Sequence, residues 1–330
     1  MKSLEASLKP LHTPVLLEAF LKAVSPISGV WVDGTFGAGG YSVALLNAGA
    51  DQVIAIDRDP ETFSRAQDWI AELGDRMTIH HGPFSDMGRF AQQVDGVILD
   101  LGISSMQIAD ASRGFSFMQD GPLDMRMSQV GKTAADLIRE SSESELADIL
   151  YQYGDERRSR RIARAIVKQR GVNPIATTGQ LTQIIENCLP LSKPHQKHPA
   201  TRSFQALRIA VNDECGELRR GLAAAERSLN PGGQLAVVTF HSIEDRMVKK
   251  FFRSRSKTAS NVNRHAPDPK HCSPKFSLRF RKPILPSDEE VKQNPRARSA
   301  KLRIAVRRST PSNPIEPVSL DTSLREKSSL

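Results

Sequence analysis

Apolar residues in the first hundred positions form short continuous runs that are separated by segments with helical spacing. The runs have the length and the β-branched residues of buried strands, and they cover residues 29–32, 52–56, 77–80 and 94–99. Helical spacing lies between them, most clearly over 60–73. Strands that alternate with helices in this way predict a doubly wound α/β fold with a parallel sheet.

The pattern changes after residue 109. Residues 110–130 have no clear period and predict a loop, whereas apolar positions over 133–190 recur at helical spacing. A further helix is expected over 203–229. It is followed by Asn230-Pro231-Gly232-Gly233, which predicts a turn because proline stops a helix and glycine permits a chain reversal.

The sheet pattern then resumes. An apolar run at 234–240 predicts a fifth buried strand, and alternation over 299–306 predicts a terminal strand. The last residues are mostly Pro, Ser and charged, which favours disorder. The predicted division is residues 1–109 and 205–308 for the sheet domain, 110–204 for an inserted small helical domain, and 309–330 for a disordered tail.

A glycine cluster, DGTFGAGG at 33–40, follows the first predicted strand, and Asp57 ends the second. An acid at a strand end can accept hydrogen bonds from both hydroxyls of a ribose, so this unit predicts a nucleoside site. Gly37 and Gly39 match a dinucleotide fingerprint, but Ser42 stands where the third glycine belongs. The carboxylate of Asp33 would repel a pyrophosphate and attract a cation, which favours S-adenosylmethionine. A tight turn without a ligand is the alternative.

Composition sets wider limits. With 39% hydrophobic and 25% charged residues, the chain is typical of a globular protein. No apolar run approaches the roughly 20 residues of a membrane span, and no secretory signal is visible. Cys188, Cys215 and Cys272 are far apart, which predicts reduced thiols in a cytoplasmic protein. The histidines His80, His81, His195 and His198 have no ligand spacing, so no metal site is expected.

The net charge of +9 favours a polyanionic partner. Between Arg246 and Lys282 there are twelve Lys or Arg residues and one acid, Asp268. Residues 156–164 predict a helix with one cationic face. Either run alone is equally well explained as a solvated surface, but two runs together with the net charge favour RNA or DNA, without sequence-specific readout.

Several long motifs resemble one family, the bacterial small-subunit ribosomal RNA cytosine-N4 methyltransferases (RsmH, or MraW). They include HTPVLL at 12–17, AIDRDP at 55–60, RGFSFMQDGPLDMRM at 113–127, HPATRSFQALRIAVNDE at 198–214 and FHSIEDRMVK at 240–249. The resemblance implies a class I methyltransferase fold, Rossmann-like, with a helical insert. It also implies S-adenosylmethionine as cofactor and N4 methylation of a cytosine in the decoding region of small-subunit rRNA, with the RNA held in the small ribosomal subunit. Tyr41 and Met106 depart from the usual family motifs.

The resemblance also implies roles for residues of the cofactor site. Asp57 is expected to bind the ribose, and Phe84 to lie against the adenine; the alternative for Phe84 is a core position. The methionine part of the cofactor is expected against Gly37, Gly39, Gly40 and the backbone of Tyr41.

The target base is expected near Asp100, which ends the fourth strand. The exocyclic amine of cytosine is a poor nucleophile, so an acceptor must orient its N–H groups, and Asp100 is a candidate for that role. We favour instead a contact of Asp100 with the cofactor, beside Gln107. Arg202, Phe204 and His241 are candidates for substrate contact, with helix core as the alternative for Phe204.

Two other functions remain possible at this point. One is a nicotinamide oxidoreductase, against which Ser42 and Asp33 argue. The other is a non-catalytic RNA-binding ribosome-assembly factor with a vestigial cofactor pocket, against which the intact glycine cluster and Asp57 argue. The sequence does not indicate an oligomeric state.

Overall fold

The computed structural model describes residues 13–190, 198–256 and 273–309. The predicted disordered tail lies outside the described residues, except for its first position, Ser309. His195, Cys272 and the middle of the basic stretch also lie outside them.

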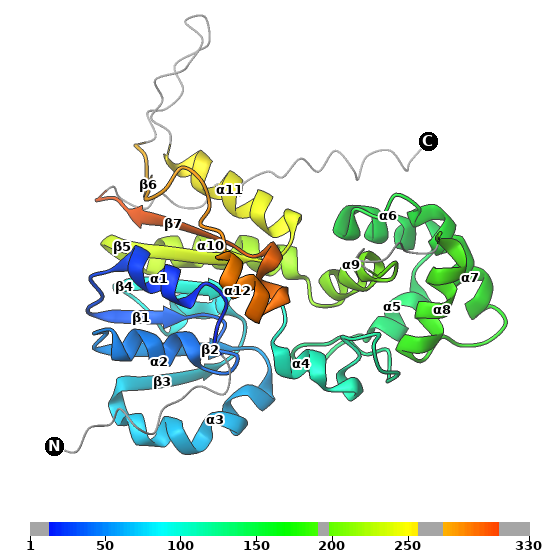
Figure 1. Ribbon diagram of the computed structural model, residues 1–330, viewed down its shortest axis with the longest axis horizontal. Coiled ribbons are helices and arrows are strands. Elements are labelled where there is room, and N and C mark those ends of the chain that lie inside the picture. The colour runs from blue at the N-terminus through cyan, green and yellow to red at the C-terminus, as the bar shows by residue number, and fades with distance from the viewer. Residues whose placement is uncertain (1–12, 191–197, 257–272, 310–330) are drawn as a thin grey trace, which may run out of the picture.

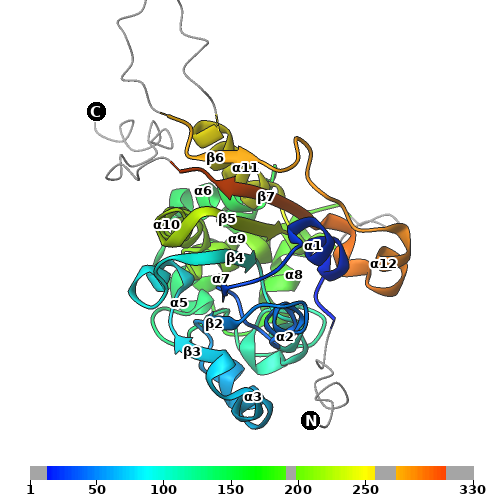
Figure 2. The ribbon, with the colours of Figure 1, turned by 90° about the vertical axis from the view of Figure 1, so that its left-hand side faces the viewer.

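A seven-stranded sheet forms the centre of the larger domain (Figures 1 and 2). Its strands are β1 (Val30–Asp33), β2 (Gln52–Asp57), β3 (Met77–His81), β4 (Val94–Asp100), β5 (Leu229–Thr239), β6 (Phe276–Leu278) and β7 (Lys301–Arg307). The order is β3-β2-β1-β4-β5-β7-β6; β1 to β5 run parallel, whereas β7 is antiparallel to β5 and to β6. This is the class I methyltransferase arrangement, so the predicted fold class is confirmed.

Neighbouring residues of each central strand point to opposite faces of the sheet, and each face has its own hydrophobic core. In β1, Trp31 packs in one core and Val32 in the other; in β4, Ile98 and Leu99 divide in the same way. The helices that cover the sheet are α1 (Leu17–Val24), α2 (Gly40–Asn47), α3 (Pro60–Leu73), α10 (Glu214–Ser228) and α11 (Ser242–Ser256). Because both faces are covered, the strands are continuous apolar runs in the sequence.

A helical insert with a third hydrophobic core lies beside the sheet domain (Figure 1, green). Its helices are α5 (Ala134–Glu140), α6 (Glu143–Gly154), α7 (Ser159–Arg170), α8 (Thr178–Cys188) and α9 (Thr201–Val211), and the short α4 (Ser105–Ala109) precedes it. Thr133, Ser142 and Thr177 cap three of these helices, each bonded reciprocally to an Asp, Glu or Gln three residues on. These capping boxes explain where the helices begin.

The single helix predicted over 203–229 is wrong. The chain forms α9 and α10, separated at Asn212 and Asp213, where Asp213 adopts a left-handed backbone with φ of 46°. Asn212 is buried, and its side chain bonds to the backbone of Met125 and Met127, which holds the break in place.

The prediction of a turn before the strand at Asn230–Gly233 is also wrong, because these residues lie inside β5. β5 already begins at Leu229, which pairs with Val94, and regular pairing resumes with Gly96 opposite Gln234. The four residues therefore form an irregularity inside the strand, where Gly232 takes a φ of 87°.

The packing of α9 bears on the boundary of the insert. Phe204, Ala206 and Leu207 belong to the insert's core, so a boundary at residue 204 divides a helix that packs as one piece. This packing supports a boundary near Asn212. None of the helices in the described ranges combines the length and the apolar character needed to cross a membrane.

Candidate functional site

A cavity of about 790 Å³ opens at the carboxyl ends of the parallel strands. This is the place where doubly wound sheets bind ligands, because the strand order reverses between β1 and β4. α4, the α9–α10 junction and the segment from α12 (Asp288–Gln293) to Ser299 complete its wall. Of the predicted site residues, those that line it are Gly37, Gly40, Tyr41, Asp57, Phe84, Asp100 and Gln107.

The carboxylate of Asp57 is fixed by two backbone amides. Gly37 N donates to Asp57 Oδ2 at 2.8 Å, and Asp59 N donates to Oδ1 at 2.8 Å. Gly37 has a φ of 55°, which brings its amide towards β2. Each carboxylate oxygen keeps a lone pair for another donor, so a ribose diol fits here. Burial raises the pKa of Asp57, and the two amides oppose that shift.

Asp33 is buried beneath the glycine turn. It accepts hydrogen bonds from Ser42 Oγ at 2.7 Å and from Thr35 N at 3.2 Å. Burial raises its pKa to about 6, while these hydrogen bonds act in the opposite direction. Ser42, which replaces the third glycine of a dinucleotide motif, is thus the partner of this acid. The pair places negative charge under the turn, which suits a cationic ligand.

Gly39 and Tyr41 have mainly structural roles. A Cβ at Gly39 would lie 2.5 Å from the ring of Trp69, and its φ is 77°, so Gly39 lets α3 pack against the turn. Gly39 is not among the described residues that line the cavity. The Tyr41 hydroxyl donates to the carbonyl of Val15, and its ring packs edge-on against Phe20.

Phe84 lies at the cavity and also packs against the protein core, while its contact with adenine stays a prediction. It lines the cavity, and its ring also packs so closely on α10 that a Cβ at Gly221 would lie 2.1 Å from it. The ring is therefore held rigidly at the cavity wall, where a planar base can lie against it.

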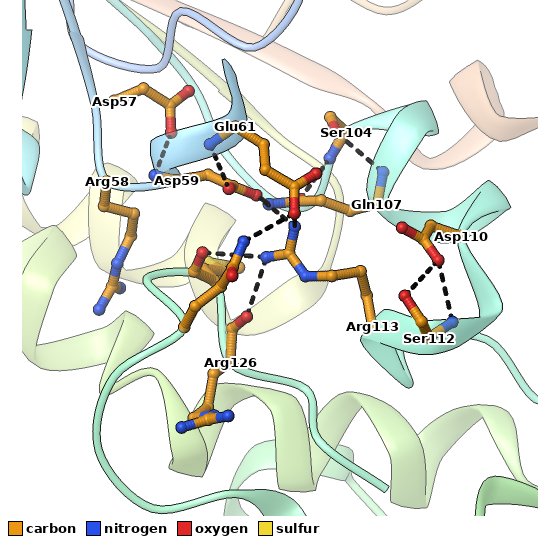
Figure 3. Close-up of polar contacts among 12 residues, drawn as sticks. Asp57, Arg58, Asp59, Glu61, Ser104, Gln107, Asp110, Ser112, Arg113 and Arg126 are labelled. Atoms are coloured by element: carbon orange, nitrogen blue, oxygen red, sulfur yellow. Dashed lines mark hydrogen bonds and ion pairs between the residues drawn. The ribbon is translucent and has the colours of Figure 1, made fainter. Parts of the chain in front are cut away.

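Gln107 is engaged by the protein at both ends of its amide (Figure 3). Its Oε1 accepts from Ser104 N at 3.0 Å, and its Nε2 donates to Asp59 Oδ2 at 2.7 Å. Arg113 Nη1 lies 2.9 Å from the same Asp59 oxygen. Gln107 therefore bonds to the turn that holds Asp57, a role that the sequence did not reveal.

Four charged side chains from separate elements also line the cavity, and we call them the charged wall. Asp100 ends β4, Arg208 lies on α9, Glu214 begins α10 and Glu244 lies on α11. Arg208 donates two hydrogen bonds to Glu214, from Nε to Oε1 at 2.7 Å and from Nη2 to Oε2 at 2.8 Å. Its Nη1 has no hydrogen bond to any described residue.

The pKa values of two of these acids, Asp100 and Glu244, are shifted in opposite directions. Asp100 Oδ1 is buried and has no hydrogen-bond partner among the described residues, and burial, with Asp33 and Glu244 nearby, raises its pKa well above the usual range. Glu244 is also buried, which by itself would raise its pKa, but His241 and Arg208 hold it below the usual value. Pairs of groups whose pKa values are pushed apart are typical of acid–base chemistry.

The three substrate candidates lie away from the cavity surface. Phe204 is buried in the insert core against Phe117, with ring centroids 5.0 Å apart, which favours the packing alternative. Arg202 is exposed, and its Nη1 donates to the carbonyl oxygen of Asp155 at 3.4 Å. His241 Nε2 lies 3.0 Å from Glu244 Oε1, so it supports the charged wall from behind.

The sequence reasoning missed Arg208, Glu214 and Glu244. All three stand in the quoted motifs at 198–214 and 240–249. Their spacing carried no signal, because only the fold brings α9, α10 and α11 to one place.

A metal at this wall is disfavoured by its own chemistry. Ligand atoms of Glu214, His241 and Glu244 lie within 4.8 Å of one another, an arrangement that can hold an ion. However, Arg208 occupies both oxygens of Glu214, and its guanidinium repels a dication. The absence of a metal stays a prediction.

Comparison with known proteins identifies the family. The MraW methylase family matches residues 9–308. The chain is 62% identical over 309 residues to the ribosomal RNA small subunit methyltransferase H of Roseobacter denitrificans, covering 94% of each chain. The proteins of the same name from Ruegeria sp. and Cereibacter sphaeroides are 59% and 57% identical, covering 95% and 96% of this chain and 94% and 96% of their own. Since the match spans nearly the whole chain, this protein belongs to the MraW methylase family.

Proposed function

We propose that this protein transfers a methyl group from S-adenosylmethionine to the N4 amine of a cytosine in small-subunit rRNA. The observation that carries the proposal is one cavity with two kinds of lining: the glycine turn with Asp57, and the charged wall with Asp100, Arg208 and Glu244. The first suits a nucleoside cofactor and the second suits the edge of a base. Family membership and the names of the relatives support an rRNA methyltransferase.

The cofactor side fits S-adenosylmethionine in charge as well as shape. Asp57 accepts from the ribose hydroxyls, and Phe84 offers a flat apolar surface to the adenine. The carboxylates of Asp33 and Asp57 place negative charge at the glycine turn, which stabilises a ligand that carries a sulfonium and an ammonium. A dinucleotide with its pyrophosphate is repelled by the same charges, so the oxidoreductase alternative is set aside.

The charged wall complements the Watson–Crick edge of cytosine. That edge presents an amine donor and two acceptors, N3 and O2. Asp100 Oδ1 has free acceptor capacity for the amine, and Arg208 Nη1 has a free donor for N3 or O2. Uracil presents a carbonyl where cytosine has its amine, and a carboxylate at that point would repel it.

The chemistry then requires orientation and removal of one proton. Bound S-adenosylmethionine supplies an electrophilic methyl carbon on sulfonium sulfur. Asp100 holds an N–H of the amine so that the nitrogen lone pair faces that carbon. The nitrogen forms the new bond as the carbon–sulfur bond breaks, and the electron pair of that bond remains on sulfur. The amine loses one proton, for which Asp100 is the proposed acceptor because its raised pKa makes it a better base.

The RNA is gripped by the insert in this proposal. The surface of α7 and its entry is basic, with exposed side chains of Arg157, Arg158, Arg160, Arg161, Arg164 and Lys168. Phosphates bind such a surface in a salt-dependent way. Assembled small subunits as the substrate, and the decoding region as the target, rest on the family resemblance.

A labelling experiment tests the proposal against a non-catalytic assembly factor. The protein is incubated with isotopically labelled S-adenosylmethionine and small subunits that lack the modification, and the RNA is then digested to nucleosides. We expect labelled N4-methylcytidine. Binding of subunits without any labelled nucleoside contradicts the enzymatic proposal, and label in another nucleoside contradicts the choice of base. An Arg208→Lys variant, which keeps the charge but loses the paired hydrogen bonds, is expected to lose most of this activity while still binding cofactor.

A further inference from the structure

A buried cluster joins the cofactor-binding turn to the entry of the helical insert (Figure 3). We call it the Asp59 joint and define it as Asp59, Gln107 and Arg113. Asp59 Oδ2 accepts from Gln107 Nε2 at 2.7 Å and from Arg113 Nη1 at 2.9 Å. The side chains of Asp59 and Arg113 are 4% and 9% exposed, so this ion pair is almost completely shielded from water.

Other polar groups of the joint are also engaged, and Arg113 Nη1 lies 3.8 Å from Glu61 Oε1 as well. Arg113 Nη2 donates to the carbonyls of Arg126 and Met127, at 3.1 and 3.0 Å. Asp59 Oδ1 accepts from Glu61 N at 3.1 Å, which caps α3. A buried pair of charges with its hydrogen bonds satisfied holds its geometry tightly, because every displacement leaves a charge unpaired.

The joint reaches the ribose site through one backbone amide. Asp59 N donates to Asp57 Oδ1 at 2.8 Å, so the position of Asp59 sets the orientation of the Asp57 carboxylate. A second tie connects the same turn to the insert, since Arg58 Nη1 donates to the carbonyl of Asn212 at 3.0 Å. Asn212 in turn bonds to the backbone of Met127.

We infer that Arg113 is a positioning residue for the cofactor: it acts through Asp59 to hold the Asp57 carboxylate where a ribose diol meets both of its oxygens. Arg113 itself does not touch the cofactor. Gln107 contributes to the same effect through the same Asp59 oxygen. The inference rests on the proposed function, because it takes Asp57 as the ribose ligand.

A double-mutant cycle on cofactor affinity tests the inference. The dissociation constant for S-adenosylhomocysteine is measured by calorimetry for the wild type, Arg113→Gln, Asp57→Asn and the double variant. We expect Arg113→Gln to weaken binding about tenfold, since a hydrogen bond to a charged group is misplaced. The double variant is expected to bind no more weakly than Asp57→Asn alone, because the effect of Arg113 passes through Asp57.

Arg126→Gln is the matched control. Arg126 lies in the same loop, its guanidinium bonds to Asp124, and only its carbonyl takes part in the contacts of Arg113. Its affinity is expected to stay within about twofold of the wild type, as for mutations outside a shared network. Equal affinities of the two Arg→Gln variants overturn the inference, as do additive losses in the cycle.

Gln107→Leu provides a second route if Arg113→Gln does not fold. It removes the other donor to Asp59 without burying a charge, and its loss of affinity is also expected to vanish in the Asp57→Asn background. An additive loss there indicates direct contact of Gln107 with the cofactor and contradicts the positioning role. If Asp57→Asn alone leaves affinity unchanged, the ribose assignment fails instead, and the two failures are thereby distinguished.

Discussion

Two parts of the cavity lining differ in how the chain builds them: the part that we assign to the cofactor, called the cofactor wall, and the charged wall, which we assign to the base and call the base wall. The cofactor wall comes mainly from one continuous stretch, residues 33–57, in which a strand, a glycine turn, a helix and a second strand follow one another. The base wall takes Asp100, Arg208, Glu214 and Glu244 from four elements, of which only α9 and α10 are neighbours in the chain. A wall made locally is encoded in a short motif, whereas an assembled wall depends on the packing of the insert against the sheet.

The largest expected effect concerns the base wall. Asp100→Asn removes the charge of the unpartnered acceptor while keeping its shape. We expect kcat for methyl transfer to fall about 100-fold or more, as for loss of a general base, with cofactor affinity little changed. Single-turnover rates and calorimetry separate the two quantities. A large loss of cofactor affinity at unchanged kcat contradicts the role of Asp100 as proton acceptor and supports a contact of Asp100 with the cofactor.

The next largest effect concerns the glycine turn of the cofactor wall, and it tests whether this turn also depends on packing against α3. Gly39→Ala places a methyl group 2.5 Å from the ring of Trp69 on α3, at a backbone φ of 77°. Overpacking together with an unfavourable backbone is expected to cost about 3 kcal/mol of unfolding free energy. Gly88→Ala is the control, since a Cβ at Gly88 would meet nothing within 4 Å and the backbone there has no positive φ. Urea denaturation measures both; equal stabilities contradict the packing role of Gly39.

A third prediction concerns the buried charge beneath the turn. Asp33 has a pKa of about 6 in the folded protein, raised by burial from 3.8. Between these values the folded state binds more protons than the unfolded state, so stability falls as pH rises from about 4 to about 6. Asp33→Asn removes that loss. The variant is expected to exceed the wild type by an amount on the order of 3 kcal/mol above pH 6, and to match it below pH 4.

The same substitution is expected to weaken binding of the cationic cofactor, because a negative charge under the turn is lost. Chemical denaturation at a series of pH values and calorimetry measure the two effects. A difference in stability that does not vary with pH contradicts the assignment of the titration to Asp33.

The smallest expected effect lies outside both walls, on the insert. Arg160 and Arg161 are exposed on α7. Replacing both with Gln is expected to weaken RNA binding and to reduce the slope of log affinity against log salt by about 1.5, if each contacts one phosphate. Arg89→Gln, an exposed arginine of the sheet domain, is the control. An unchanged salt slope contradicts the role of α7 in RNA binding.

Features built from neighbouring residues could be predicted from the sequence, whereas features that depend on long-range contacts could not. The strands and the glycine turn were predictable because an apolar run, a Gly-rich turn and a terminal acid act over a few residues. The break at Asn212 was not, because its cause is a buried amide that bonds to Met125 and Met127, far away in the chain. Gly39 was predicted as a cofactor contact, since the motif does not reveal that Trp69 covers it.

The sequence by itself determined the parallel sheet, the helical insert, the glycine turn and, through its long motifs, the family. Tertiary structure decided the base wall and the Asp59 joint. It brought Arg208 of α9 and Glu244 of α11 to the cavity in which Asp100 has a free oxygen. The physical reason is range: backbone propensities and turn chemistry act between neighbours, whereas a buried charge finds its partner only after distant elements have packed and excluded water.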